Sequence, residues 1–279
     1  MASLKDLENN FSKQERRIEN QSIRFYSNKT KSTNALIFLP GTSGKSETYY
    51  QIISELDDSF NIIAFDYPII MKIDDLIEII EKFIDSFDFQ NISLVGNSFG
   101  TLLIQMLVNR RPNIYRDVFM INPATKTVNV KSEDIQSHIK SYKKQLHVLN
   151  GIFPFLYKTS YKRNIKVMVY NSSIKDKKKW YKFYIDLFNE TKREESIAIY
   201  ECLLDFWQTK NFLKSDFKDY EKTVHVLMSD INTSQSKSEF ESVPKLFQKV
   251  EIYKLPDNRN LTLIKHAQLI SEIIINTFH

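Results

Sequence analysis

The sequence predicts an α/β protein: a mostly parallel sheet with crossover helices and one long helical insertion. Short apolar runs alternate with segments of helical periodicity in the first and last parts of the 279-residue chain, which is the pattern of parallel strands joined by helices. Residues 124–219 interrupt that alternation and indicate a mostly helical segment. Four of the five glycines lie in two short clusters, 41–44 and 96–100, each directly after an apolar run. Glycine kept at such points indicates turns with demanding backbone geometry.

The predicted elements follow one another along the chain. Residues 1–19 are polar and are expected to form a mobile arm or a frayed helix. Strands are predicted at 23–26, 35–39, 61–67, 92–95, 117–121, 224–228 and 250–253, and helices at 46–56, 73–84, 101–110, 239–248 and 261–278. Within the insertion, the pattern of residues 165–170 fits a strand as well as a helix. We therefore expect a core of residues 20–123 and 220–279, with residues 124–219 inserted as a lid.

Composition excludes several classes of protein. Hydrophobic residues make up 42% of the chain and charged residues 26%, which suits a folded domain rather than a disordered chain. The single cysteine, Cys202, excludes an internal disulfide framework and a cysteine zinc cluster, and its apolar neighbours place it in a core. The first residues lack the apolar region of a signal peptide, and no apolar run is long enough to cross a bilayer. We expect a soluble, cytoplasmic protein that uses no metal and no cofactor.

The segment Gly96-Asn-Ser98-Phe-Gly100 matches G-x-S-x-G. It follows the apolar run 92–95 and opens the helical pattern 101–110, as the strand–turn–helix motif of a serine nucleophile requires. Such a turn exposes the serine hydroxyl at its apex, and Gly96 and Gly100 leave room where the strand and the helix crowd together. Ser98 is therefore the predicted nucleophile. The alternative is a glycine-flanked turn with a solvated serine.

The second glycine cluster, Gly41-Thr-Ser-Gly44, follows the strand predicted at 35–39. In folds with a nucleophile turn, a loop at this point supplies a backbone N–H to an oxyanion hole. The backbone amides of Thr42 and Phe99 are the predicted pair of donors. The alternative is a Pro-Gly turn without a catalytic role.

These residues resemble those of the α/β-hydrolase superfamily. The resemblance covers about 30–125 and 222–279, and it rests on residues 39–44, on residues 96–100 and on the order of the strands. Residues 35–68 are similar to maspardin, a hydrolase-fold protein taken to act as a binding partner rather than a catalyst. Residues 260–267 resemble the end of polyketide and non-ribosomal-peptide thioesterases. The family order implied for the catalytic residues is serine, then acid, then histidine.

The resemblance also implies positions for the acid and the histidine. Asp230 ends the strand after the insertion and is the predicted acid, Asn232 occupies a second position where the acid falls, and the thioesterase pattern instead points to Asn122. The histidine position holds Asn258 in the maspardin-like match and Asn260 in the thioesterase-like match. A carboxamide does not accept a proton near neutral pH, so neither asparagine can be the base.

The predicted base is His266, because it is the only histidine near the implied position. It can reach Ser98 only if the last helix begins after it; otherwise it is a histidine on a helix surface. His225 alternates within a strand and is expected to be structural. His138 and His147 lie in the lid, and a lid histidine that reached down to Ser98 would depart from the family geometry.

Charge is distributed unevenly along the chain. Nine basic residues lie between Lys158 and Lys182 with Asp176 as the only acid there, whereas residues 45–88 hold eleven acids and three bases. A molecule with such separated charges can steer an acidic partner to its basic side. An acidic acyl carrier protein would suit the thioesterase resemblance, and the alternative is a solvated helical face. No motif supports nucleic-acid binding.

The sequence therefore leaves two main functions open. The first is a serine-dependent acyl hydrolase, an esterase or thioesterase acting on a small acyl ester or thioester, with Ser98 as nucleophile and Asp230 orienting His266. The second is a catalytically degenerate hydrolase fold that acts as a binding or adaptor module, because asparagines stand where the histidine is expected. A weaker third possibility is an acyltransferase built on the same serine turn.

Overall fold

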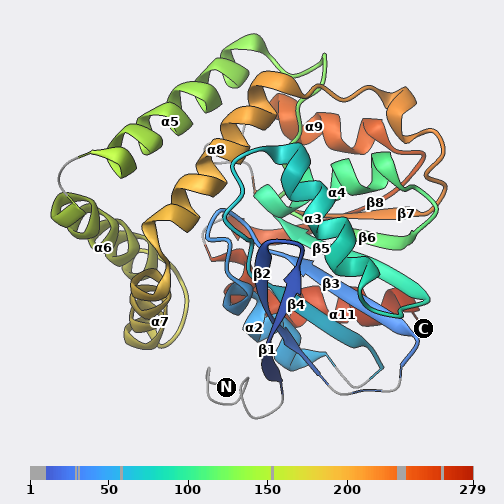
Figure 1. The fold of residues 1–279 in the computed structure, drawn as a ribbon, viewed down its shortest axis with the longest axis horizontal. Coiled ribbons are helices and arrows are strands. Elements are labelled where there is room, and N and C mark those ends of the chain that lie inside the picture. The colour runs from blue at the N-terminus through green and yellow to red at the C-terminus, as the bar shows by residue number, and fades with distance from the viewer. Residues whose placement is uncertain are drawn as a thin grey trace.

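An eight-stranded sheet forms the centre of the molecule (Figure 1). The computed structural model describes residues 11–28, 30, 32–56, 59–151, 154–230, 237–258 and 261–278, and for residues 154–157, 230, 237, 240, 257 and 258 it describes the backbone alone. The strands lie in the order β1-β2-β4-β3-β5-β6-β7-β8. They are β1 (Ser12–Ile18), β2 (Gln21–Ser27), β3 (Asn34–Leu39), β4 (Asn61–Phe65), β5 (Asn91–Asn97), β6 (Tyr115–Ile121), β7 (Thr223–Asp230) and β8 (Lys249–Asn258).

The strands from β4 to β8 in the sheet order pair in parallel fashion, and β2 pairs in antiparallel fashion with both β1 and β4. This confirms the predicted α/β architecture, because parallel neighbours need helical crossovers between them. The first strand is a difference from the expectation. Residues 12–18, expected in a mobile arm or frayed helix, form the edge strand β1, whose side chains are mostly exposed. An exposed edge strand needs no apolar alternation, so the sequence gives it no signal.

Helices cover both faces of the sheet (Figure 1). Alternate residues of β3 point to opposite faces: Ile37 and Leu39 join the hydrophobic cluster under α3, α4 and α9, and Leu36 and Phe38 join the cluster under α2 and α11. The core helices are η1 (Ser46–Tyr49), α2 (Tyr50–Glu55), α3 (Ile73–Asp85), α4 (Phe99–Arg110), α9 (Lys237–Leu246), α10 (Thr262–Lys265) and α11 (Ala267–Phe278).

The segment between β6 and β7 forms a helical lid, which runs from the top of Figure 1 down its left side. Its helices are α5 (Ser132–Asn150), α6 (Pro154–Tyr170), α7 (Lys177–Glu190) and α8 (Arg193–Thr209), followed by η2 (Lys214–Phe217). The ambiguous stretch 165–170 is helical, within α6. Helix α8 returns to the core, where the fully buried Cys202 donates its thiol hydrogen to the carbonyl of Ile70 at 3.0 Å. Burial raises the pKa of the Cys202 thiol, so it packs as a small apolar side chain.

No helix in the described ranges is both long enough and apolar enough to cross a membrane.

Candidate active site

Ser98 lies at the turn between β5 and α4, with φ 50° and ψ −111°. A positive φ is uncommon for a residue with a side chain and stores about 1–3 kcal/mol of strain. Hydrogen bonds hold the turn on both sides. The Ser98 amide donates to the carbonyl of Ile121 at 3.1 Å, and the Ser98 carbonyl accepts from the amide and the hydroxyl of Thr101 at 2.9 and 2.6 Å. The strand, the turn and the helix lie where the sequence predicts them.

Two glycines make this turn possible. A Cβ on Gly100 would lie 2.1 Å from the carbonyl oxygen of Leu39 in β3, and a Cβ on Gly96 would lie 2.8 Å from the carbonyl oxygen of Gly100. Both distances are far below van der Waals contact, and the crowding atoms belong to the backbone and cannot move aside. This crowding agrees with the expectation that Gly96 and Gly100 leave room where the strand and the helix meet.

The loop after β3 packs directly on the Ser98 turn. A Cβ on Gly41 would lie 3.1 Å from Asn97 Nδ2 and 3.7 Å from the Cβ of Ser98. Gly44 has φ +65°, and its amide donates to the carbonyl of Gly41 at 3.0 Å, which closes the loop into a tight turn. Thr42, at the tip, is exposed and borders the same cavity as Ser98.

Two buried tyrosines hold this loop from the core side. The Tyr49 hydroxyl donates to the carbonyl of Leu39 at 2.8 Å, and the Tyr67 hydroxyl donates to the carbonyl of Pro40 at 2.6 Å. Burial raises the pKa of both phenols well above the ordinary value, so both remain donors. The Tyr67 ring also meets the ring of Phe99 edge-on at 5.5 Å. The loop and the first residue of α4 are therefore fixed relative to each other.

A cavity of about 540 Å³ lies over Ser98, a size typical of sites for small molecules. The loop after β3, the Ser98 turn and the start of α10 form its core side. The lid forms the other side, through Ser137, His138, Ser141, Tyr142, Met168 and Tyr184.

One histidine, His138 of α5, shares this cavity with Ser98. Its Nε2 lies 2.7 Å from Oε1 of Glu239 in α9, and its Nδ1 lies 3.3 Å from the hydroxyl of Tyr142. The Glu239 side chain is fully buried, and the imidazole stacks on the ring of Trp207 at 4.1 Å. With Nε2–H donated to the carboxylate, Nδ1 is left to accept from Tyr142. Burial and the charge of Glu239 raise the pKa of the Tyr142 phenol.

The pairing of His138 with Glu239 is the feature that the sequence did not reveal. From the sequence, His138 is only a lid histidine outside the family geometry, and no pattern points to Glu239. A usable signal exists, because Glu239 is the first acid after Asp230 and lies in the helix that follows β7. Within the described residues, no hydrogen bond joins Ser98 to a histidine, so any proton path between Ser98 and His138 crosses the cavity.

Neutral side chains occupy the core side of the cavity near Ser98. Asn122 directly follows β6 and has φ 46°, and its Nδ2 donates to Oγ1 of Thr262 at 2.9 Å. Its Oδ1 accepts from the amide of Ser229 at 3.1 Å, and the Ser229 and Thr262 hydroxyls lie 3.1 Å apart. Asn122 and Thr262 are buried, and both border the cavity. Asn122, Thr262 and Ser229, the described members of this network, include no group that takes up a proton near neutral pH.

His266 does not share the cavity with Ser98. The short helix α10 ends at Lys265 and the last helix, α11, begins at Ala267, so the last helix does begin after His266. His266 nevertheless does not border the cavity over Ser98. His266 instead lines a smaller cavity beside Gln51 and Trp180. The structure therefore does not bring His266 and Ser98 together in one cavity.

Asp230 ends β7, and its Cα pairs with that of Asn258 in β8. The predicted acid position and one of the asparagines at the implied histidine position are thus neighbours across two strands. The side chains of both residues, and the whole of Asn232 and Asn260, lie outside the described residues.

A group of buried charges joins the lid to the loop beside Ser98. Lys45 directly follows Gly44, and its ammonium lies 2.8 Å from Glu195 of α8 and 3.3 Å from Asp66. Arg24 of β2 contacts the same two carboxylates, at 3.1 and 3.2 Å. The lid is therefore fixed to the loop by ion pairs as well as by apolar packing.

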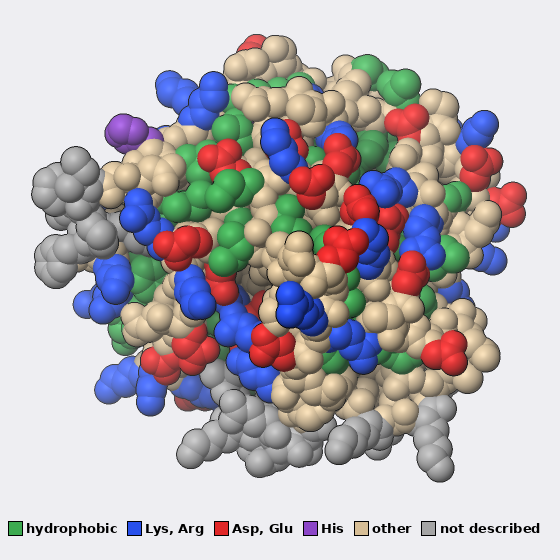
Figure 2. Space-filling view, in the orientation of Figure 1, with side chains coloured by type: hydrophobic (Ala, Val, Ile, Leu, Met, Phe, Trp, Pro, Cys, Tyr) green, Lys and Arg blue, Asp and Glu red, His purple; other side chains and the backbone are tan. Residues whose placement is uncertain are grey.

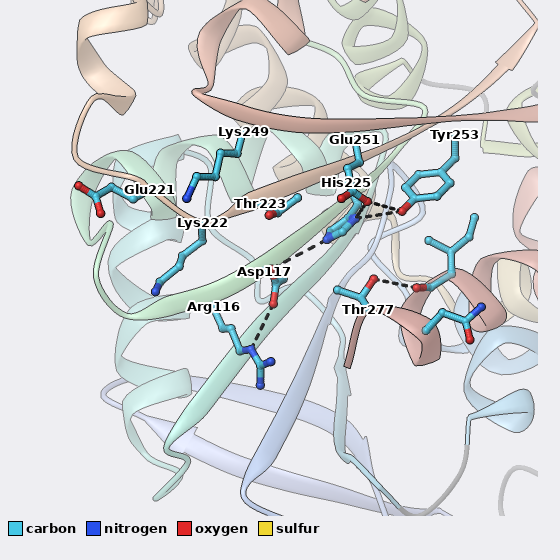
Figure 3. Close-up of a pocket in the computed structure, with 12 residues that line it drawn as sticks. Arg116, Asp117, Glu221, Lys222, Thr223, His225, Lys249, Glu251, Tyr253 and Thr277 are labelled. Carbon is cyan, nitrogen blue, oxygen red and sulfur yellow. Dashed lines mark hydrogen bonds and ion pairs between the residues drawn. The ribbon is translucent and has the colours of Figure 1, made fainter. Parts of the chain in front are cut away.

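Another cavity of about 540 Å³ lies at the opposite ends of the strands from Ser98, where β6, β7 and β8 begin (Figure 3). It brings His225 between Asp117 and Glu251, with Arg116 alongside (Figure 3). His225 is 2% exposed and stacks on Phe119 at 4.6 Å, in line with the predicted structural role. In the described part of the chain, no three His, Cys, Asp or Glu side chains are grouped to hold a metal ion. Ligands of parallel α/β sheets bind at the opposite, carboxyl end of the strands, where Ser98 lies.

Lys and Arg side chains lie along the left of the view in Figure 2, over α6 and α7. Lys162, Arg163 and Lys166 of α6 are exposed, and Val167 beside them is 53% exposed. The basic character predicted for residues 158–182 is thus largely presented to solvent.

Comparison with known proteins gives weak sequence likeness and strong structural likeness. No family model matches the chain. Phytyl ester synthase 2, a chloroplastic protein of Arabidopsis thaliana, is 28% identical over 130 residues, which cover 44% of this chain and 18% of that protein. The chain therefore matches less than a fifth of the length of this curated relative.

Among solved structures, a hydrolase of Pseudomonas aeruginosa is similar with a TM-score of 0.76 at 11% identity, covering 96% of this chain and 98% of that one. An α/β hydrolase from a deep-sea metagenome library has a TM-score of 0.74 at 11% identity, covering 95% and 97%. A bacterial membrane phospholipase A has a TM-score of 0.73 at 13% identity, covering 96% and 86%. Haloalkane dehalogenase is also among the similar structures, so the fold by itself does not fix the reaction. The parallel sheet, the helical lid and these likenesses together establish that the chain has the α/β-hydrolase fold.

Proposed function

We propose that the protein is a serine-dependent acyl hydrolase of the esterase or thioesterase type, with Ser98 as its nucleophile. One observation carries the proposal: a serine held at positive φ borders a cavity that is also lined by a histidine hydrogen-bonded to a buried carboxylate. A strained nucleophile, a base and a group that orients the base are the parts that acyl transfer needs.

In the proposed reaction, the Ser98 oxygen attacks the carbonyl carbon of a bound ester or thioester. The serine proton passes to Nδ1 of His138, through the Tyr142 hydroxyl or a water in the cavity, and the charge of Glu239 stabilises the imidazolium that forms. The backbone amides of Thr42 and Phe99 are the proposed donors to the oxyanion. The imidazolium then returns the proton to the departing alcohol or thiol, and water releases the acyl group by the same route.

His138 takes the catalytic role that was predicted for His266, and Glu239 takes the role predicted for Asp230. His138 borders the same cavity as Ser98, whereas His266 borders another. The order along the chain becomes serine, histidine, acid, an arrangement in which geometry and roles matter more than sequence order.

The same mechanism can use different acyl acceptors and different acyl donors. The Arabidopsis relative is named an ester synthase, so an alcohol in place of water would make the protein an acyltransferase. The exposed Lys and Arg side chains of α6 and α7 support an acidic carrier protein as the acyl donor, because opposite charges speed and orient such an encounter.

A second candidate function is a binding module without catalysis. It is favoured by the neutral network of Asn122, Thr262 and Ser229, which lies where the thioesterase pattern expects an acid and near where it expects a base.

Labelling with a fluorophosphonate probe separates the two functions. A working site labels the wild type, loses the label in Ser98→Ala, and labels about 10²–10⁴-fold more slowly in His138→Gln. His147→Gln is the matched control, because His147 is a lid histidine that does not border the cavity. Absence of labelling in the wild type would favour the binding module. Labelling that is slowed in His266→Gln but not in His138→Gln would identify His266, rather than His138, as the base.

A further inference from the structure

A smaller cavity of about 280 Å³ lies next to the cavity over Ser98 and is lined by basic and polar side chains. Lys175 comes from the segment before α7, Lys265 and His266 come from the end of α10, and Gln51 comes from α2. Ser173 also borders it. None of the described residues that line this cavity is acidic, so it carries a net positive charge even with a neutral imidazole.

A rigid apolar wall backs these charges. Trp180 lines the cavity, is 3% exposed, and packs at 5.6 Å against the rings of both Tyr50 and Phe183. The ammonium of Lys179 lies 5.5 Å from the centre of the Trp180 ring. A low-dielectric wall strengthens the attraction of the cavity for a negative group.

The two cavities lie on neighbouring sides of one short helix. Thr262 and Leu263 border the cavity over Ser98, whereas Ile264, Lys265 and His266 border the basic one. A helix rises about 1.5 Å per residue, so roughly one helical turn separates the two sets of lining residues along α10. Consecutive residues of α10 thus line the two cavities, and a substrate that occupies both would pass around this helix.

We propose that the basic cavity binds the phosphate group of a substrate whose acyl group enters the cavity over Ser98. This inference rests on the proposed acyl-transfer function. A phosphate accepts several hydrogen bonds and is attracted by full positive charges, and Lys175, Lys265 and His266 can supply both, with Gln51 and Ser173 as neutral donors. His266 thereby gains a role as a binding residue rather than as the base.

The same phosphate chemistry occurs in two kinds of acyl substrate. In one, the acyl group is a thioester on a thiol that carries a phosphorylated arm; in the other, it is an ester in a glycerophospholipid. The basic face of α6 and α7 is compatible with either substrate class, and the turnover experiment below distinguishes them.

Direct binding tests the site independently of turnover. Isothermal titration of the Ser98→Ala protein with inorganic pyrophosphate is expected to show binding that weakens about tenfold in Lys265→Gln and in His266→Asn, because each loses a charged or hydrogen-bonding partner. Lys166→Gln is the matched control, since Lys166 is exposed on α6 and does not line the cavity. Equal affinity in Lys265→Gln, His266→Asn and the control, or no binding to the parent protein, would overturn the proposal. Circular dichroism of each variant shows that the fold is kept.

Turnover then identifies the source of the phosphate. With active protein, Lys265→Gln is expected to lower kcat/KM about tenfold for a short acyl-coenzyme A thioester or for a lysophospholipid, and to leave the hydrolysis of a neutral p-nitrophenyl ester unchanged. Loss confined to one of the two phosphorylated substrates names the class. An equal loss on the neutral ester would contradict a phosphate-specific role. Pyrophosphate binding without turnover of any ester would refute the acyl hydrolase and keep the anion site.

Discussion

Glu195 of α8 gives the sharpest test of how the lid is joined to the loop beside Ser98. Its carboxylate lies 2.8 Å from the ammonium of Lys45 and 3.1 Å from the guanidinium of Arg24. Asp66 completes the group, at 3.3 Å from Lys45 and 3.2 Å from Arg24, so two cations face two anions. The Lys45 side chain is 5% exposed, so water cannot replace a partner that it loses.

Glu195→Gln keeps the size of the side chain and removes its charge. Breaking a buried ion pair from one side costs about 3–5 kcal/mol. Asp66 remains beside Lys45, and the Glu195 side chain is 11% exposed, so we expect a loss of about 3 kcal/mol in the free energy of unfolding, at the low end of that range. With a denaturant slope of about 3 kcal/mol per molar urea, the unfolding midpoint would fall by about 1 M.

Urea unfolding followed by fluorescence measures this change, because the two tryptophans, Trp180 and Trp207, are both buried. Glu78→Gln is the matched control, since Glu78 pairs with Lys82 at 2.6 Å and both side chains are largely exposed. Exposed pairs contribute little to stability, so its midpoint should stay near the wild-type value. A midpoint shift in Glu195→Gln no larger than that in Glu78→Gln would refute the reasoning.

Three further predictions concern the Ser98 turn, the network beside it and the far edge of the sheet. Gly100→Ala should lose about 3 kcal/mol of stability or fail to fold, because its Cβ would lie 2.1 Å from a backbone oxygen; Gly151→Ala, whose Cβ would meet nothing closer than 3.3 Å, should change stability by under about 1 kcal/mol in the same urea assay. Asn122→Ala should lower the thermal midpoint measured by calorimetry, since it leaves the buried amide of Ser229 without its acceptor, at about 1–3 kcal/mol; an unchanged midpoint would contradict this. Burial and a hydrogen bond to Glu251 raise the pKa of Tyr253 to about 12. Its neutral form is therefore favoured in the folded state, and its stabilising contribution is complete below pH 10 and lost as pH rises through 12. Tyr253→Phe should make the fall in stability between pH 10 and 12 shallower than in the wild type, and equal slopes would count against this assignment.

Much of the fold could be predicted because its signals are local. The apolar run 35–39 and the periodic segment 73–84 correspond to β3 and α3 within one residue. Both are buried on one or both faces, so their sequences carry the period of the element. The edge strand β1 carried no such signal, because its mostly exposed side chains are under no demand for apolar alternation.

The candidate site divides in the same way. The serine turn could be predicted because Gly96, Ser98 and Gly100 are close in sequence and form a recognisable motif, although the atom that crowds Gly100 most closely, the carbonyl oxygen of Leu39, belongs to a distant strand. The proposed base could not be predicted, because His138 and Glu239 are 101 residues apart and meet only after the lid folds over the sheet. The family order also implies a histidine after the acid in the sequence, whereas His138 lies before Glu239, in the lid.

The sequence by itself determined the parallel sheet, the helical lid and the place of Ser98, since each follows from periodicity or from a turn that only glycine permits. The tertiary structure decided which titratable groups share the cavity with Ser98. It placed His138 in that cavity, hydrogen-bonded to the buried carboxylate of Glu239, and placed His266 in a different, basic cavity. The physical reason is that pairing between distant side chains depends on how the lid helices pack on the core, and one helical turn at α10 is enough to direct neighbouring residues into separate cavities.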